Sequence, residues 1–149
     1  MNYFLSDFFT RLRVWHELKN KLQGSDLEQI CVEVDQFWQQ CPLISHYLHP
    51  SDVDTWPTPW ELLKDNVYCN YARALGMTYT LLLLGVKNID FIEATDYNSN
   101  SVVLVSVCTD NTKYVMNYWP GSVLNTNLSD FTINRHLDIA SLYKKIGIA

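Results

Sequence analysis

The sequence predicts an α+β fold, and two patterns along the chain carry this prediction. Up to residue 84, apolar residues recur at the three- and four-residue spacing of amphipathic helices. After Gly85 the chain changes to short runs rich in β-branched and aromatic residues, separated by turn segments, which is typical of an antiparallel sheet. We expect one domain over residues 1–149, because a chain of this length can bury a core without disulfides. Its predicted parts are a helical hairpin over 1–42, a central helix plus β-meander over 58–119, and a C-terminal helix over 134–149.

Two amphipathic helices are predicted to form the N-terminal hairpin. The first covers residues 4–22 and has Ser6 or Asp7 near its start. The second follows Gly24 and ends before Pro42; Ser25 stands three residues before Glu28, which is the spacing of a capping box. A short turn between two such helices makes them antiparallel neighbours.

A long central helix is predicted to begin at Pro59 and run to Leu84. Thr58 is a good N-cap, Glu61 completes a capping box with it, and proline is favoured at the first helical position. An unbroken helix of this length would be about 39 Å long at 1.5 Å per residue. Only a break at Asp65-Asn66 would divide it.

Three strands are predicted after the central helix, in an antiparallel meander on which that helix packs. Their sequences are NIDFIEAT, SVVLVSVCT and TKYVMNYW. The last segment, HLDIASLYKKIGIA, has the spacing of a short amphipathic helix. The long central helix and a three-stranded sheet would form most of the core.

The composition excludes several classes of function. The net charge is −5 and the 11 basic residues are scattered, which argues against a nucleic-acid partner. No apolar run approaches the roughly 20 residues that a bilayer requires, so we expect no membrane partner. The chain has no Gly-rich phosphate loop, GxSxG elbow or HExxH motif, and we expect no cofactor. The four cysteines lack paired spacing and are interpreted as thiols in a reducing cytoplasm.

The segments YCNYARALGMTYTLLLLG and VVLVSVCTDNTKYVMN resemble the core of transglutaminase-like, papain-like cysteine hydrolases. This resemblance covers residues 60–119 and implies a nucleophile, Cys69, on a helix that crosses strands supplying His and Asp. The histidine is expected at 100–102 and the aspartate at Asn117, and neither place holds a titrating side chain. Cys69 also lies nearly three turns beyond Thr58, whereas helix dipoles act within about one turn. We therefore predict an inert thiol inside the central helix.

Two further candidate sites are weaker. Cys41, His46 and His49 offer thiolate and imidazole ligands for zinc, although their spacing fits no common zinc pattern, and exposed histidines beside a cysteine at a helix end are the favoured interpretation. Aromatic anchors for a protein partner are the other candidate, since Trp side chains often dominate interfaces. The candidate anchors are Trp15, Trp38, Trp56, Trp60 and Trp119.

The segments TWPTPWELL and ALGMTYTLLL resemble a small protein type of tailed bacteriophages. This resemblance implies synthesis in the host cytoplasm and then a place in the virion, in the tail or head–tail connector. The favoured hypothesis is a non-enzymatic structural or assembly protein, a pseudo-enzyme that contacts other phage proteins or itself. Two alternatives stay open: a Cys69-dependent cysteine hydrolase or acyl transferase, and an inhibitor of host defence that sequesters a small ligand.

Overall fold

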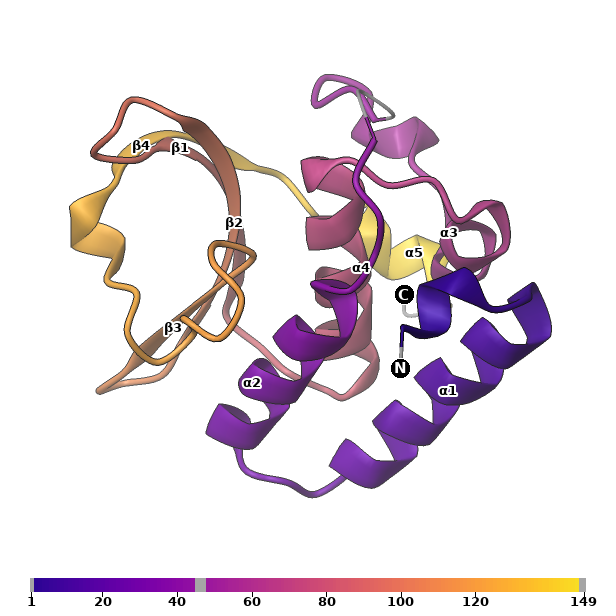
Figure 1. Cartoon of the computed structure of the whole chain (residues 1–149). Coiled ribbons are helices and arrows are strands. Elements are labelled where there is room, and N and C mark those ends of the chain that lie inside the picture. Colours follow the sequence, from indigo (N-terminus) through magenta and orange to yellow (C-terminus); the bar gives the residue numbers. More distant parts are fainter. Residues whose placement is uncertain (1, 45–47, 148–149) are drawn as a thin grey trace.

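The fold is α+β, as the sequence predicts, with helices first, then an antiparallel sheet and a short last helix (Figure 1). The structure is a computed structural model that describes residues 2–44 and 48–147. Its helices and strands are α1 Phe8–Leu22, α2 Leu27–Trp38, α3 Pro59–Asp65, α4 Asn70–Leu83, β1 Ile89–Thr95, β2 Ser101–Cys108, β3 Lys113–Met116, β4 Thr132–Leu137 and α5 Leu142–Lys145.

The N-terminal hairpin is present as α1 and α2, and an aspartate caps each helix. Asp7 accepts a hydrogen bond from the backbone N–H of Thr10 at 2.8 Å. Asp26 accepts one from Gln29, also at 2.8 Å. The cap of α2 is therefore one residue later than the predicted Ser25, and Asp26 accepts from the third N–H of the helix.

The predicted central helix is divided in two. Its start is confirmed, because Thr58 and Glu61 form both hydrogen bonds of a capping box and Pro59 is the first helical residue. The prediction of one unbroken helix to Leu84 is wrong: α3 ends at Asn66, which has left-handed backbone angles of φ 55° and ψ 40°. Asparagine tolerates this conformation better than most residues, and the Asn66 side chain donates to the carbonyl of Phe4 at 2.9 Å.

The sheet has four antiparallel strands in the order β3-β2-β1-β4. The three predicted strands form the expected meander, and β4 adds a fourth at the edge beside β1. Part of the region predicted as a C-terminal helix, from residue 134, is thus strand, and α5 is only four residues long. The pattern missed β4 because five of its six residues are exposed and polar and apolar side chains do not alternate.

The two faces of the sheet are buried in different ways. One face carries Phe91, Val103 and Val105 into the main core below the helices. The other carries Ile92 and Leu104 into a smaller cluster, which the chain between β3 and β4 covers with side chains that include Phe131. In Figure 1 this connecting segment arches across the sheet on the side away from the helices.

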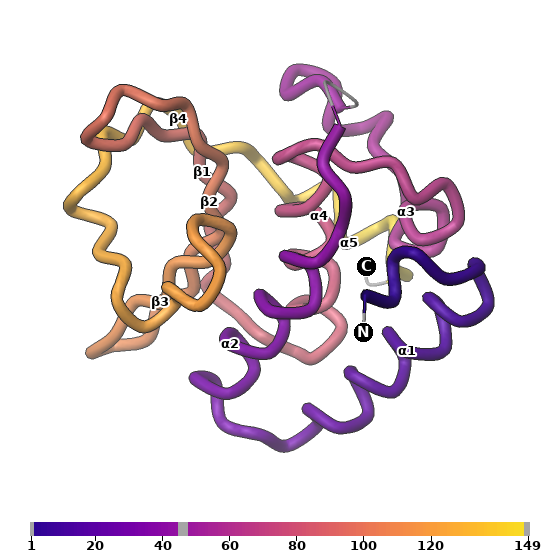
Figure 2. Tube along the Cα trace, viewed as in Figure 1, coloured from indigo at the N-terminus to yellow at the C-terminus, as the bar shows by residue number. Residues whose placement is uncertain are grey.

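Helix α4 packs closely on α2 and against β2 and β1, and α2 itself also contacts β3 (Figure 2). Gly76 permits the close approach of α4 to α2, because a Cβ atom there would lie 2.5 Å from the Trp38 ring. Two indole N–H groups, from Trp15 and Trp38, each donate to the Thr80 hydroxyl oxygen at 3.0 Å. Among the described residues, none of the helices has the length and apolar character needed to cross a bilayer.

Candidate functional site

The break between α3 and α4 moves Cys69 to the first position of a new helix. Cys69 is the N-cap residue of α4, with extended backbone angles, and its carbonyl accepts the first helical hydrogen bond from Arg73 at 2.9 Å. Its side chain caps none of the N–H groups of the first turn. Those groups have no acceptor within the helix and together form its positive end. The prediction that Cys69 lies in the middle of a helix, away from the dipole, is therefore wrong.

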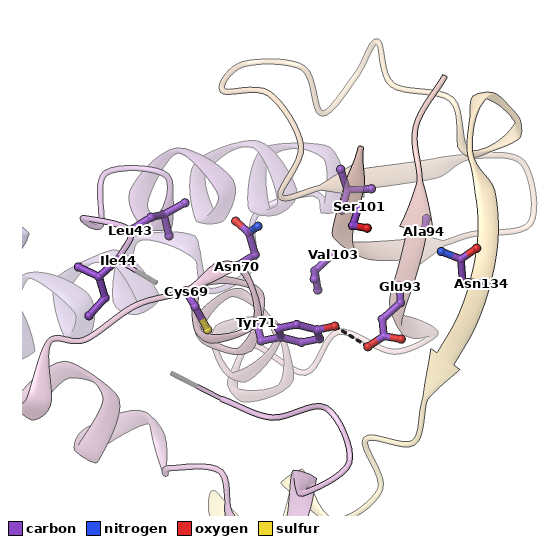
Figure 3. A pocket seen from close by; sticks show the side chains of 11 residues that line it. Leu43, Ile44, Cys69, Asn70, Tyr71, Glu93, Ala94, Ser101, Val103 and Asn134 are labelled. Atoms are coloured by element: carbon purple, nitrogen blue, oxygen red, sulfur yellow. Dashed lines mark hydrogen bonds between the residues drawn. The ribbon is translucent and has the colours of Figure 1, made fainter. Parts of the chain in front are cut away.

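Cys69 borders a cavity of about 420 Å³ between the start of α4, the loop after α2 and the sheet. In Figure 3 the sulfur lies beside the Tyr71 ring, with Leu43 and Ile44 on one side and Glu93 and Asn134 on the other. The end of the cavity beside the loop after α2 is apolar, and its end beside the sheet, called the polar end here, holds Glu93, Ser101 and Asn134 together with apolar side chains of the strands. Its lining residues are Leu43, Ile44, Cys69, Asn70, Tyr71, Glu93, Ala94, Ser101, Val102, Val103 and Asn134.

A hydrogen-bonded chain of three side chains closes the polar end. The Tyr71 hydroxyl donates to Glu93 Oε1 at 2.5 Å (Figure 3), and Arg135 donates from Nε and Nη2 to the two oxygens of Glu93 at 2.9 Å each. The bonds from Arg135 lower the pKa of Glu93 below its usual value, more than its burial raises it. Burial, and then the bond to Glu93, raise the pKa of the Tyr71 phenol. At neutral pH these three side chains are therefore a neutral phenol (Tyr71), a carboxylate (Glu93) and a guanidinium (Arg135).

Asn117 joins the start of α4 to the sheet. Its side-chain Nδ2 donates to the carbonyl of Val103 on β2 at 2.8 Å and to that of Asn70 at 3.2 Å, and its Oδ1 accepts from Arg73 at 2.5 Å. Its backbone N–H donates to the buried carboxylate of Asp35 at 2.9 Å. Asn117 thus holds the first turn of α4 against β2.

The structure brings Cys69 together with only some of the positions that the resemblance to cysteine hydrolases implies. Ser101 and Val102, two of the three positions implied for the histidine, line the cavity that Cys69 borders, whereas Asn100 lines a different cavity together with Asn117. As the sequence predicts, these positions hold no histidine and no aspartate. Within the described residues no histidine lines this cavity; His136, on β4, lines a neighbouring one.

The zinc candidate is only partly described. Cys41 is buried, and its burial raises the pKa of the thiol to about 12. His49 Nδ1 lies 2.6 Å from the hydroxyl of Ser51. His46 lies outside the described residues, so a zinc site with Cys41 and His49 stays a prediction.

The five tryptophans predicted as partner contacts divide by exposure. Trp15, Trp38 and Trp56 are buried in the core and are not available to a partner. Trp60 and Trp119 are exposed, with Trp119 at 66%, and for these two the predicted role stays open. The indole N–H of Trp56 donates to the carbonyl of His49 at 2.9 Å, so this buried ring holds the loop before α3.

Sequence reasoning missed Tyr71, Glu93, Asn134 and Arg135. Asn134 is the extra residue of a β-bulge, because Glu93 pairs with Arg135 and Ala94 with Ile133. Bulges of this kind redirect side chains and are common beside active sites. The signal in the sequence was a Glu on a strand and a Tyr two residues after the cysteine, which is not informative until β4 is known to pair with β1.

The comparisons with known proteins give one fold. No family model and no curated protein matches the chain. Solved structures of Legionella pneumophila LapG do match, at 16% identity over 90% of this chain and 76% of that one, with a TM-score of 0.69. A calcium-bound LapG structure matches at 15% identity over 89% and 77%, with a TM-score of 0.72, and an EGTA-treated one at 16% over 90% and 75%, with 0.68. LapG has a transglutaminase-like cysteine protease fold, and this chain shares that fold.

The likeness corrects the favoured hypothesis. A non-enzymatic virion structural or assembly protein, a component of tail or head–tail connector, and a pseudo-enzyme were the expectations that followed from the phage resemblance. They are overturned, because the fold matches that of a cysteine protease and nothing found supports a virion role. The fold is instead the one that the Cys69-dependent alternative implies.

Calcium, which one of the LapG structures contains, does not fit the residues described for this chain. They include no group of three or more His, Cys, Asp or Glu side chains that could hold a metal ion. Glu93 is the carboxylate of the Cys69 cavity, and hydrogen bonds from Tyr71 and Arg135 engage both of its oxygens.

Proposed function

We propose that this chain is a cysteine-dependent hydrolase or acyl transferase in which Cys69 is the nucleophile. The observation that carries the proposal is the position of Cys69, at the uncapped start of α4 and on the wall of a cavity. A negative sulfur is favoured at the positive end of a helix, and cysteine nucleophiles gain reactivity there. The likeness of the fold to LapG, which has a cysteine protease fold, also supports a reacting thiol in this chain.

The first step would be attack of the Cys69 thiolate on an acyl carbon. Negative charge then develops on the carbonyl oxygen, and unpaired backbone N–H groups are the usual donors to such an oxyanion. The first turn of α4 offers its N–H groups beside the sulfur, since the Cys69 side chain does not cap them.

Asn117 is a positioning residue in this proposal. Its side chain donates hydrogen bonds to the carbonyls of Asn70 and Val103, and so holds Asn70, the residue after Cys69, against β2. A thiol whose helix is held in this way needs little reorganisation before it reacts, which favours catalysis.

Alkylation by iodoacetamide near neutral pH tests the nucleophile. We expect Cys69 to be labelled faster than Cys31, Cys41 and Cys108, as followed by peptide mass spectrometry over time. Cys31 and Cys41 are buried, and burial raises the pKa of each thiol to about 12, so both should react slowly. We expect Cys69 to be labelled about 10-fold faster than Cys108.

Cys108 is the decisive comparison because it is more exposed than Cys69, which is 7% exposed. If access alone governed the reaction, Cys108 would be labelled first, and that result would remove the proposal. The Cys69→Ala variant should lose the fast phase, and Cys108→Ala should keep it.

The partner and the place in the cell stay predictions from the sequence. The predicted partners are other phage structural proteins or a second copy of this chain, with no nucleic acid and no membrane, and the predicted place is the host cytoplasm and then the virion. A test on whole-cell lysate would compare proteins acylated or cleaved with the wild-type chain and with Cys69→Ala.

A further inference from the structure

The groups in the Cys69 cavity that can donate a proton limit which acyl donors the cavity can accept. The inference drawn from them rests on the proposed function of Cys69 as a nucleophile. Cleavage of an amide requires a proton for the departing nitrogen, and enzymes supply it from a positioned group that titrates near the working pH. Among the described residues that line the cavity, Tyr71 and Glu93 are the titrating groups besides Cys69 itself.

Neither of these two groups is suited to give a proton at neutral pH. Glu93 is ionised, because the hydrogen bonds from Arg135 lower the pKa of its carboxyl. Tyr71 keeps its proton, because burial raises the pKa of its phenol, and it directs that proton to Glu93 across 2.5 Å. The other polar groups of the lining, Asn70, Ser101 and Asn134, carry no proton that dissociates in this range.

A thioester does not need such a donor. Its leaving group departs as a thiolate, and since free thiols titrate at roughly 8.5 that anion is stable enough in water to leave unprotonated. The departing nitrogen of an amide is a far stronger base and does not leave as an anion. The described lining of the cavity therefore favours acyl donors whose leaving group needs no proton.

We propose that Cys69 accepts acyl groups from thioesters, in preference to cleaving amides. The Cys69 thiol first loses its proton to solvent. The thiolate attacks the carbonyl carbon, a C–S bond to Cys69 forms, and the C–S bond of the donor breaks. The departing sulfur takes the electron pair and then a proton from water, which leaves S-acyl-Cys69 and a free thiol.

The shape of the cavity agrees with this class of donor. A volume of about 420 Å³ suits a small acyl group with part of its carrier. Leu43 and Ile44 offer an apolar end for an acyl chain, and they are 45% and 56% exposed, so uncovered apolar area is available there. At the polar end, the hydroxyl of Ser101 and the amide of Asn134 can form hydrogen bonds with a polar carrier.

A matched pair of small donors tests the inference. The S-acetyl thioester of N-acetylcysteamine and the diamide in which nitrogen replaces its sulfur differ only in the leaving group. Intact-mass and peptide spectrometry should show one acetyl group on Cys69 with the thioester, formed about 100-fold faster than on Cys108 or on free N-acetylcysteine. The diamide should be turned over, measured as release of N-acetylethylenediamine, at least about 100-fold more slowly than the thioester at equal concentration, because the amide nitrogen needs a proton donor to leave.

The controls separate this inference from the proposed function. Cys69→Ala should lose the acetyl adduct and Cys108→Ala should keep it. If the diamide acetylates Cys69 or is turned over at a rate near that of the thioester, the thioester preference is wrong while the nucleophile stands. The preference is also wrong if iodoacetamide labels Cys69 first but the thioester does not acetylate it. If neither reagent selects Cys69 over Cys108, the proposed function itself fails.

Discussion

At the scale of single residues, Thr80 is the acceptor on which two buried indoles depend. Its hydroxyl oxygen accepts from the N–H groups of Trp15 and Trp38 and donates to the carbonyl of Gly76 at 2.7 Å. Both rings are fully buried, so neither N–H can turn to solvent. A buried donor left without an acceptor costs about 1–3 kcal/mol.

Thr80→Val should therefore lower the free energy of unfolding by about 2–5 kcal/mol, since it leaves two indole donors unpaired. Thr78→Val is the matched control: Thr78 is also buried on α4 and also bonds the carbonyl four residues before it, but it accepts from no indole. Urea unfolding of both variants measures the difference. Equal losses would show that the indole bonds contribute nothing.

Glu93 on β1 forms an ion pair with Arg135 on β4 at the edge of the cavity. The contribution of Glu93 to the free energy of unfolding should therefore depend on pH. The pKa of the Glu93 carboxyl in the folded chain lies below the usual 4.5, with the bonds from Arg135 as the main cause. A lowered carboxyl pKa stabilises the fold above the unfolded pKa, and this stabilisation is lost as the pH falls through the folded value.

Glu93→Gln should thus lower the free energy of unfolding by about 1 kcal/mol at pH 7, a small value because Arg135 is half exposed and its charge is screened. The difference from the wild type should stay constant down to about pH 4.5 and shrink below it. Chemical unfolding at pH 7 and at pH 3.5 measures both ends. A difference that grows on acidification would contradict the assignment.

At the scale of elements, the junction between α3 and α4 decides the site. Asn66 ends one helix in a left-handed conformation, and three residues later Cys69 begins the next. The side chain of Asn66 also ties this junction to the carbonyl of Phe4, far away in the sequence. The place of the thiol thus depends on one backbone conformation and one long-range hydrogen bond.

Asn66→Ala should destabilise the chain by about 2–3 kcal/mol, from left-handed strain and the lost bond together. Asn66→Gly keeps the conformation without strain and loses only the bond, so it should cost less. The two variants are compared by thermal unfolding and by the rate of Cys69 alkylation. A larger loss for glycine than for alanine would exclude strain as the cause.

This junction also shows what the sequence could predict. The capping box of Thr58 and Glu61 is a local signal, complete within four residues, and it fixed the start of α3 correctly. Asp65-Asn66 is the one place for a break that the sequence indicates, and asparagine tolerates left-handed angles, but the bond from Asn66 to Phe4 is long-range and has no local signal. The strand β4 depends on pairing with β1, so it has no local pattern. The resemblance predicted the fold of the core and the candidate nucleophile, but the chain of Tyr71, Glu93 and Arg135 required the sheet order.

At the scale of the whole molecule, the chain is built as a helical layer and a curved sheet that meet along α4. The sheet buries both faces, one under α4 and the other under the segment that precedes β4. This order leaves the start of α4 where the helical layer, the loop after α2 and the sheet come together, and the Cys69 cavity lies at this place. The fold is shared with LapG, whereas the residues around the thiol differ from those the resemblance implied.

Calcium is expected to leave the thermal stability of this chain unchanged. A ligand that binds only the folded state raises the unfolding temperature, and the described residues hold no metal-binding cluster. Unfolding scans in millimolar calcium and in EGTA should agree to within about 1 °C. A rise of about 4 °C or more in calcium, equivalent to roughly 1 kcal/mol, would show a site that the described residues do not form.

The contact between Gly76 and Trp38 limits how the sequence between α3 and α4 can change in length. Residues 66–69 are not helical, so one added or deleted residue there would change the length of the link between α3 and α4 by about 3.5 Å. The capping box fixes where α3 begins, and a Cβ atom at position 76 would lie 2.5 Å from the Trp38 ring, so α4 keeps its packing on α2 only with Gly76 at this contact. Among sequences that keep this fold, we therefore expect substitutions in this junction but no insertions or deletions, and the spacing from Thr58 to Cys69 and on to Gly76 should be constant.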